Sequence, residues 1–148
     1  MASVAIGGTF DVLHDGHKAL LKKAYVLGDV IIGLVSDEMA RKKGHVVNTY
    51  HSRKKSVTGY IKEALTGADP LIVALNDPYG PTLEQAFDYI VVSPDTLPTA
   101  KEINALRSKR GLPPIKIACV NFVLAQDGKP ISSTRIHNGE IDAHGVLL

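Results

Sequence analysis

The sequence of 148 residues lacks any long apolar segment. Its stretches without a charged residue reach ten positions, as in Ile117 to Gln126, whereas a membrane-spanning helix needs about 20 apolar residues. No basic residue precedes Lys18 and no long apolar core lies near the N-terminus, so we expect no secretory signal peptide. These absences predict a cytoplasmic protein that has no membrane partner.

Cysteine and tryptophan are also scarce. The single cysteine, Cys119, cannot form an internal disulfide, and its apolar setting, Ile117–Val120, predicts the inside of a strand rather than a reactive thiol. Tryptophan is absent, and the aromatic residues are five tyrosines and three phenylalanines. A surface for stacking the bases of single-stranded nucleic acid is therefore not expected.

One segment lacks acidic residues although the whole chain is nearly neutral. Seventeen basic and 15 acidic residues give a net charge of +2. The pI of about 8.6 lies below the value of roughly 9 expected of a dedicated nucleic-acid-binding domain. No acidic residue lies between Glu38 and Glu63, and such a local positive patch suits a polyphosphate ligand. Its basic residues are Arg41, Lys42, Lys43, Arg53, Lys54, Lys55 and Lys62.

The rest of the composition is that of an ordinary globular chain. Hydrophobic residues make up 45% and charged residues 22%, which excludes collagen-like, coiled-coil and largely disordered chains. At about 150 residues per domain, the length predicts a single domain that spans residues 1–148.

Strand-like and helix-like segments alternate along this domain. Apolar runs of strand length cover Ser3–Gly7, Val30–Val35, Pro70–Leu75, Tyr89–Val92 and Ile115–Leu124. Helical spacing or helix boundaries mark Leu20–Leu27, Val57–Leu65, Thr99–Arg110 and a short segment, Thr134–Asn138, with Ser132 as its N-cap. The short loops between them predict an α/β fold: a Rossmann-like, doubly wound, five-stranded parallel sheet with helices on both faces.

The loop after the first predicted strand carries a phosphate-binding pattern, at the strand end where such sheets bind ligands. Gly7 and Gly8 let the backbone approach a phosphate, and His14 and His17 fall where the N–H groups of a helix start attract anions. The spacing matches neither the dinucleotide fingerprint nor the Walker A loop. Both histidines could instead be satisfied polar residues at a helix start. A zinc pair is a weaker alternative, because the other four histidines show no metal-ligand spacing.

This loop resembles the signature of the nucleotidyltransferase superfamily, Gly-Thr-Phe-Asp followed by His-x-Gly-His. Ile131–Thr134 matches a second part of that signature, Ile-Ser-Ser-Thr at a helix start, although alone it would be an ordinary N-cap. In the superfamily an arginine commonly follows the next isoleucine, where this chain has His137. Arg135 or His137 could therefore supply the usual γ-phosphate contact.

The middle of the chain narrows the resemblance. Asn76–Thr82, Val91–Ser93 and Ile103–Arg107 look like the archaeal and eukaryotic type of phosphopantetheine adenylyltransferase, and the likeness runs from about Val4 to Asp142. This resemblance implies transfer of AMP from ATP to 4′-phosphopantetheine, which gives dephospho-CoA and pyrophosphate, with Mg²⁺ held by the ATP phosphates. It leaves open whether CoA is a feedback ligand.

The same resemblance implies roles for individual residues. Thr9 would bind near the substrate phosphate, His17 would donate to the α-phosphate in the transition state, and His14 would bind the triphosphate. Lys42 would bridge the attacking and α-phosphates, a role that Lys43 could take over. Alone, this basic segment would be a solvated loop. No general base is required, because a phosphate monoester with a second pKa near 6 is largely dianionic at pH 7.

Further residues complete the predicted site. The ATP-binding set adds Gly7, Gly8, Phe10, Val92, Ser93, Ser132, Ser133, Thr134 and Arg135. The substrate-binding set adds Asp11, Asn76, Asp77, Tyr79, Asn104 and Arg107. Asp77 and Tyr79 could equally form a Pro-directed turn, and Asn104 and Arg107 could be polar residues on the surface of a helix.

Two rival functions remain. A cytidylyltransferase or FAD-synthetase-like enzyme would share both motifs, but cytidylyltransferases usually carry Arg-Thr-x-Gly where this chain has Asp127-Gly-Lys-Pro130. A non-catalytic nucleotide- or RNA-binding module could use the basic segment, but the few aromatic residues offer little surface for stacking bases. The sequence leaves the oligomeric state open.

Overall fold

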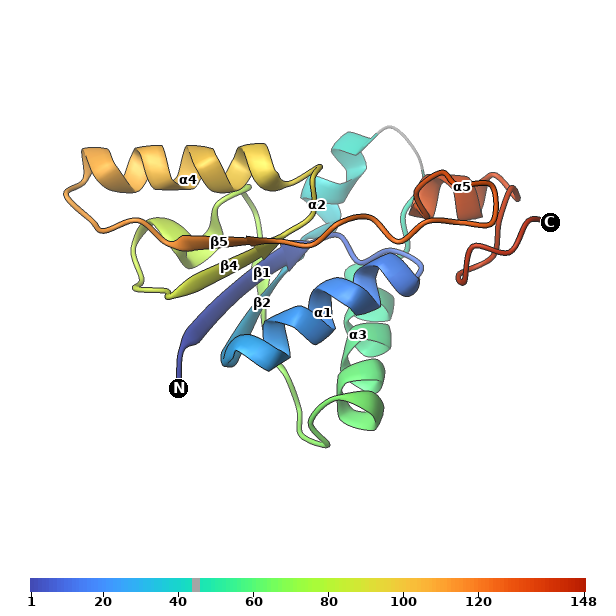
Figure 1. Cartoon of the computed structure of the whole chain (residues 1–148), viewed down its shortest axis with the longest axis horizontal. Coiled ribbons are helices and arrows are strands. Elements are labelled where there is room, and N and C mark those ends of the chain that lie inside the picture. Colours follow the sequence, from blue (N-terminus) through green and yellow to red (C-terminus); the bar gives the residue numbers. More distant parts are fainter. Residues whose placement is uncertain (44–45) are drawn as a thin grey trace.

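Five strands form one all-parallel sheet at the centre of the computed structural model, which describes residues 1–43 and 46–148 apart from the side chain of Lys43 (Figure 1). The strands are β1 (Ser3–Gly8), β2 (Asp29–Val35), β3 (Leu71–Leu75), β4 (Tyr89–Val92) and β5 (Lys116–Cys119), in the order β3-β2-β1-β4-β5. The helices are α1 (Asp15–Leu27), α2 (Asp37–Ala40), α3 (Tyr50–Ala64), α4 (Leu97–Lys109) and α5 (Ser133–His137), with 3₁₀ turns η1 (Arg41–Lys43) and η2 (Gly80–Leu83). The predicted Rossmann-like α/β fold is confirmed.

Each face of the sheet has its own helices. Val4 and Ile6 of β1 pack with Leu21 of α1 and Ile61 of α3, whereas Ala5 packs with residues of α4. This alternation follows from the period-two geometry of a strand. As a result, α4 covers one face while α1 and α3 cover the other (Figure 1). No helix in the described part of the chain is long and apolar enough to cross a membrane.

The strand order reverses at β1. β2 and β3 lie on one side of β1, whereas β4 and β5 lie on the other. β1 pairs with β4 from Val4 and Tyr89 to Ile6 and Val91, so the two strands end beside each other. Doubly wound sheets bind ligands at such a switch point, beyond the carboxyl ends of the strands.

β5 is shorter than the predicted strand Ile115–Leu124, and Cys119 is not buried. β4 ends at Val92, and Val120 N donates to Val92 O at 2.8 Å just beyond the last residue of β5. The chain thus runs past the end of β4, its neighbouring strand. β5 is one of the two edge strands of the sheet, and Cys119 at its end is exposed, so the predicted buried position is wrong.

Neither α2 nor η2 was predicted. α2 starts at Ser36, whose Oγ accepts a hydrogen bond from Met39 N at 3.2 Å. η2 follows a turn at Asp77, whose Oδ1 accepts from Tyr79 N at 2.8 Å. Both are too short for a helical period to be visible in the sequence. Both follow strand ends, and they help to build the walls of the site.

Candidate active site

The loop between β1 and α1 is held in a strained backbone conformation. Phe10 and Val12 have φ angles of +49° and +46°, in the left-handed region that costs a non-glycine residue about 1–3 kcal/mol. The Phe10 side chain is buried in the core, and a Cβ atom on Gly8 would lie 3.1 Å from its ring. Burial of this ring offsets the strain and fixes the loop, and its closeness to position 8 favours glycine there.

His14 and His17 cap α1 together. His14 Nδ1 accepts hydrogen bonds from Gly16 N at 3.1 Å and His17 N at 3.3 Å. His14 N in turn donates to His17 Nδ1 at 3.3 Å, which completes a capping box built from two imidazoles. The rings stack with their centroids 3.7 Å apart. Both Nδ1 atoms are therefore satisfied by the helix start.

These hydrogen bonds place the proton of each imidazole on the other nitrogen. A neutral imidazole whose Nδ1 accepts a hydrogen bond carries its proton on Nε2. Burial lowers the pKa of His14 to about 4, although Asp15 acts in the opposite direction. His14 is therefore neutral at pH 7. The start of α1 thus carries two stacked imidazoles whose Nε2–H groups are donors.

The low pKa of His14 should make folding stability depend on pH. Because the folded pKa of about 4 lies below the ordinary value of 6.5, the stabilisation is complete above pH 6.5 and is lost as the pH falls toward 4. In His14→Asn, Asn can still cap α1 but does not titrate. We expect urea unfolding to show similar stabilities for the unsubstituted protein and the variant at pH 7.5. At pH 4.5 the unsubstituted protein should have lost about 2 kcal/mol relative to the variant. If the stabilities of the two proteins changed in parallel with pH, the low pKa of His14 would be contradicted.

The Ile-Ser-Ser-Thr segment forms the start of α5. Ser132 is the N-cap, and its Oγ accepts from Arg135 N at 3.2 Å. Ser133 Oγ donates to the main-chain oxygen of Asp11, which ties α5 to the loop after β1. The two motifs of the sequence therefore border one cavity from opposite ends of the chain.

Two cavities meet at the carboxyl ends of β1 and β4. One cavity, of about 320 Å³, is bordered by His14, His17 and the start of α5. We call it the nucleotide-side cavity, after the ATP contacts predicted for these residues. The apolar cavity, of about 420 Å³, lies on the α4 side of the sheet and is bordered by strand residues, Tyr79 and Lys42. The residues that border both are Gly7, Gly8, Thr9, Val91, Val92 and Thr96. Ligands in the two cavities could therefore touch beside Thr9.

The other predicted contacts with these cavities come from separate strand ends. Lys42, in η1, is exposed and borders the apolar cavity. The side chain of Lys43 lies outside the described residues. Ser93 follows β4 and borders the nucleotide-side cavity, with its main-chain N bound to Thr96 Oγ1 at 3.0 Å.

Asp11 borders the nucleotide-side cavity, and its carboxylate has a structural role that was not predicted. Its carboxylate is 2% exposed. Oδ1 accepts from Asn48 N at 3.0 Å and Asn48 Nδ2 at 2.8 Å, and Oδ2 lies 2.7 Å from His137 Nε2. Burial acts to raise the pKa of Asp11, but the hydrogen bonds from His137 and Asn48 outweigh it and the pKa is lowered. The carboxylate therefore joins the first loop to α5 and to the segment before α3.

Both candidates for the γ-phosphate contact are held by protein groups. Arg135 pairs with Asp127, and its Nε lies 3.3 Å from Glu140 Oε1. His137 pairs with Asp11. The expectation that one of them replaces the usual arginine is therefore not supported, because acidic side chains of this chain already compensate the charge of Arg135.

Asn104 and Arg107 stabilise the fold and do not border either cavity. Arg107 is 2% exposed and donates to main-chain oxygens of Thr82, Gln85 and Pro113 at 2.8–2.9 Å. Asn104 exchanges two hydrogen bonds with the main chain just before β5, at 2.8 and 2.9 Å. The structure therefore does not support their predicted contact with substrate, and the buried guanidinium on α4 excludes the alternative of an exposed surface residue for Arg107.

The three residues after β3 that were predicted to contact substrate differ in position. Asp77 makes a turn, since its Oδ1 accepts from Tyr79 N and Gly80 N at 2.8 and 2.9 Å. Tyr79 borders the apolar cavity, and its hydroxyl donates to Glu102 Oε1 at 2.6 Å. Asn76 is exposed and borders neither cavity. Of the three, Tyr79 is placed to touch a ligand.

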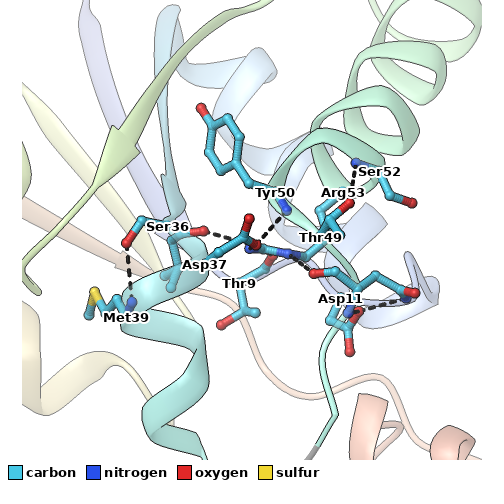
Figure 2. Close-up of polar contacts among 11 residues, drawn as sticks. Thr9, Asp11, Ser36, Asp37, Met39, Thr49, Tyr50, Ser52 and Arg53 are labelled. Carbon is cyan, nitrogen blue, oxygen red and sulfur yellow. Dashed lines mark hydrogen bonds and ion pairs between the residues drawn. The ribbon is translucent and has the colours of Figure 1, made fainter.

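Arg53 belongs to the local positive patch between Glu38 and Glu63, yet its side chain is 1% exposed. It reaches the main-chain oxygen of Thr9 beside both cavities, at 3.0 Å (Figure 2). The signal was present in the sequence, because Arg53, Val57 and Ile61 follow one another at four-residue intervals on one face of α3. A charged residue in line with two buried apolar positions indicates a buried guanidinium.

Comparisons with known proteins show the family of this chain. Residues 5–139 match a family described as cytidylyltransferase-like. A phosphopantetheine adenylyltransferase of Methanosarcina acetivorans is 51% identical over 151 residues, which cover 99% of this chain and 96% of the relative. The chain belongs to the phosphopantetheine adenylyltransferases of the cytidylyltransferase-like family. Another member, from Archaeoglobus fulgidus, is 46% identical over 147 residues, 98% of this chain and 99% of its own.

A solved structure supports the fold in particular. A protein of unknown function from Archaeoglobus fulgidus has 42% sequence identity and a TM-score of 0.77, covering 80% of this chain and 88% of its own. The family assignment thus rests on the sequence comparisons, and the structural match supports the fold.

Proposed function

We propose that this protein transfers the AMP moiety of ATP to 4′-phosphopantetheine, forming dephospho-CoA and releasing pyrophosphate. The observation that carries the proposal is the pair of cavities that meet at Gly7–Thr9. One cavity offers N–H donors suited to a polyphosphate, whereas the other has the apolar lining that suits a pantetheine arm. The names of relatives that are 46–51% identical support the same reaction.

ATP would lie in the nucleotide-side cavity. The Nε2–H of His14 would donate to the triphosphate, and that of His17 would donate to the α-phosphate, on which negative charge grows in the five-coordinate transition state. Val92 and Ser93 would border the adenosine. Hydroxyl and main-chain N–H groups of Ser132–Thr134 would contact the phosphates from the α5 side.

The second substrate, 4′-phosphopantetheine, would lie in the apolar cavity, with its arm along Tyr79 and its phosphate beside Thr9 and Lys42. An oxygen of that phosphate forms a bond to the α-phosphorus of ATP, while the bond from this phosphorus to the pyrophosphate oxygen breaks. Alignment and charge stabilisation supply the catalysis, so no side chain has to accept a proton. CoA shares the pantetheine arm and the adenosine of the product, and we expect it to compete for the same cavities.

Mg²⁺ would arrive on the phosphates of ATP and neutralise part of their charge. Mg²⁺ is usually bound through one or two carboxylates together with substrate phosphates. Asp95 borders the nucleotide-side cavity and is exposed. Among the residues that the structure describes, no three His, Cys, Asp or Glu side chains gather into a metal site. This donor set fits a cation held mainly by the substrate phosphates.

The test is a pyrophosphate-release assay with defined substrate pairs. Release should require ATP and 4′-phosphopantetheine together, in the presence of Mg²⁺. Release with CTP and phosphocholine instead would favour the rival cytidylyltransferase. Calorimetry with ATP and with a short RNA addresses the non-catalytic rival, for which tight, salt-sensitive RNA binding without ATP binding would be expected.

A further inference from the structure

Arg53, on the buried face of α3, contacts segments from two different strand ends (Figure 2). After β1, its Nη1 donates to Thr9 O at 3.0 Å. At the end of β2, Nη1 also donates to Val35 O at 2.7 Å, and Nη2 lies 3.2 Å from Asp37 Oδ1. Nη1 thus binds two residues that border the proposed site, Thr9 and Val35, whereas Nη2 binds Asp37 at the start of α2.

The same guanidinium holds both ends of the segment that carries Lys42. Asp37 begins this segment, and Arg53 Nε donates to Asn48 O, near its end, at 2.8 Å. Asp37 is fixed further because its Oδ1 accepts from Tyr50 N at 2.6 Å, at the start of α3. Lys42 lies between these two attachments, so Arg53 ties the described residues on both sides of it, and Asp11 also binds Asn48 at the second attachment.

We propose that Arg53 is a positioning residue for adenylyl transfer. It fixes Thr9 from one side and the Lys42 segment from the other, and so sets the separation of the two residues that contact the attacking phosphate. This inference rests on the proposed function. A planar guanidinium can reach acceptors in several directions at once, whereas a lysine ammonium is a single point of charge. The geometry therefore requires arginine.

The contribution of Arg53 should fall on turnover and not on ATP binding. Displacing reacting groups by about 1 Å can cost roughly 10²-fold in rate. The histidines that would bind ATP are held by main-chain atoms at the start of α1, whereas the hydrogen bonds given for Arg53 go to Asn48, Thr9, Val35 and Asp37. Loss of Arg53 would thus lower kcat while the dissociation constant for ATP stays nearly unchanged.

The experiment compares Arg53→Lys with Arg107→Lys. Arg107 is a matched control, because it is 2% exposed and also donates to main-chain oxygens, but it borders neither cavity. Both variants should lower the midpoint of urea unfolding by similar amounts. Arg53→Lys should lower kcat by about 10²-fold with an ATP dissociation constant within about threefold of the unsubstituted value, whereas Arg107→Lys should keep kcat within about threefold.

Equal losses of kcat in the two variants, or an Arg53→Lys variant with unchanged kcat, would overturn the inference. If Arg53→Lys does not fold, Asp37→Ala decides, because the Asp37 side chain is 55% exposed and can be removed without opening the core. A several-fold loss of kcat with unchanged ATP binding then supports the inference, and unchanged kcat overturns it. Inactivity of the unsubstituted enzyme with both substrates would instead refute the proposed function.

Discussion

Replacing His17 with alanine should lower kcat by about 10²–10³-fold while the dissociation constant for ATP changes by no more than a few-fold. His17 Nδ1 is occupied by the main-chain N of His14, so its Nε2–H is the donor proposed for the α-phosphate. Charge on that phosphate grows during transfer, so the hydrogen bond is strongest in the transition state. His14 and the start of α5 border the same cavity and would retain the bound nucleotide.

A second substitution separates this catalytic effect from the helix cap. Alanine also removes half of the capping box, which should cost about 1 kcal/mol of stability. Glutamine at this position can accept the hydrogen bond from the N-cap and should restore stability in urea unfolding. Turnover of His17→Gln should stay at least about tenfold low, because the imidazole donor is missing. Full activity in either variant would remove His17 from the mechanism.

Lys42→Ala should lower kcat/KM for 4′-phosphopantetheine by about 10²-fold or more, since one charged donor to a reacting phosphate is lost. Lys42 borders the apolar cavity from η1 and does not border the nucleotide-side cavity. It is exposed, and no ion pair of its ammonium is found among the described residues, so folding stability should hardly change. Steady-state kinetics together with urea unfolding measures both quantities.

The neighbouring lysine is the natural comparison for this measurement. Lys43→Ala removes the same charge one residue further along the chain, so general electrostatic attraction of the substrates is matched between the variants. If Lys42 bridges the two phosphates, Lys43→Ala should lose much less activity. A larger loss in Lys43→Ala would assign the bridging role to Lys43, and small losses in both variants would contradict a bridging lysine here.

Local sequence patterns were sufficient for the sheet and for the parts of the site that are continuous in sequence. Short apolar runs separated by helical stripes predict strands and helices, because each face of these elements meets a core. The histidine loop and the Ile-Ser-Ser-Thr segment lie at helix starts, as predicted, and border one cavity. Their chemistry depends on neighbours within a few residues, which sequence spacing describes directly.

Contacts between distant residues could not be predicted in the same way. Asp11 is bound by Asn48 and His137, which lie 37 and 126 positions away. A motif shows that a carboxylate is present but not which donors will surround it. Arg107 was assigned to substrate for the same reason, because nothing near it in the sequence reveals the carbonyl groups that it binds. The exposure of Cys119 depends on which strands form the edges of the sheet, and this is a property of the topology.

The central claim is that two substrates, held in separate cavities, react directly where the cavities meet. The most direct test is the exchange of labelled pyrophosphate into ATP by the unsubstituted enzyme with Mg²⁺. Direct transfer predicts exchange when 4′-phosphopantetheine is present, because the dephospho-CoA that forms can return AMP to pyrophosphate. It predicts no exchange with ATP and pyrophosphate alone. Exchange without 4′-phosphopantetheine would mean that AMP is first transferred to the protein, and would contradict the account.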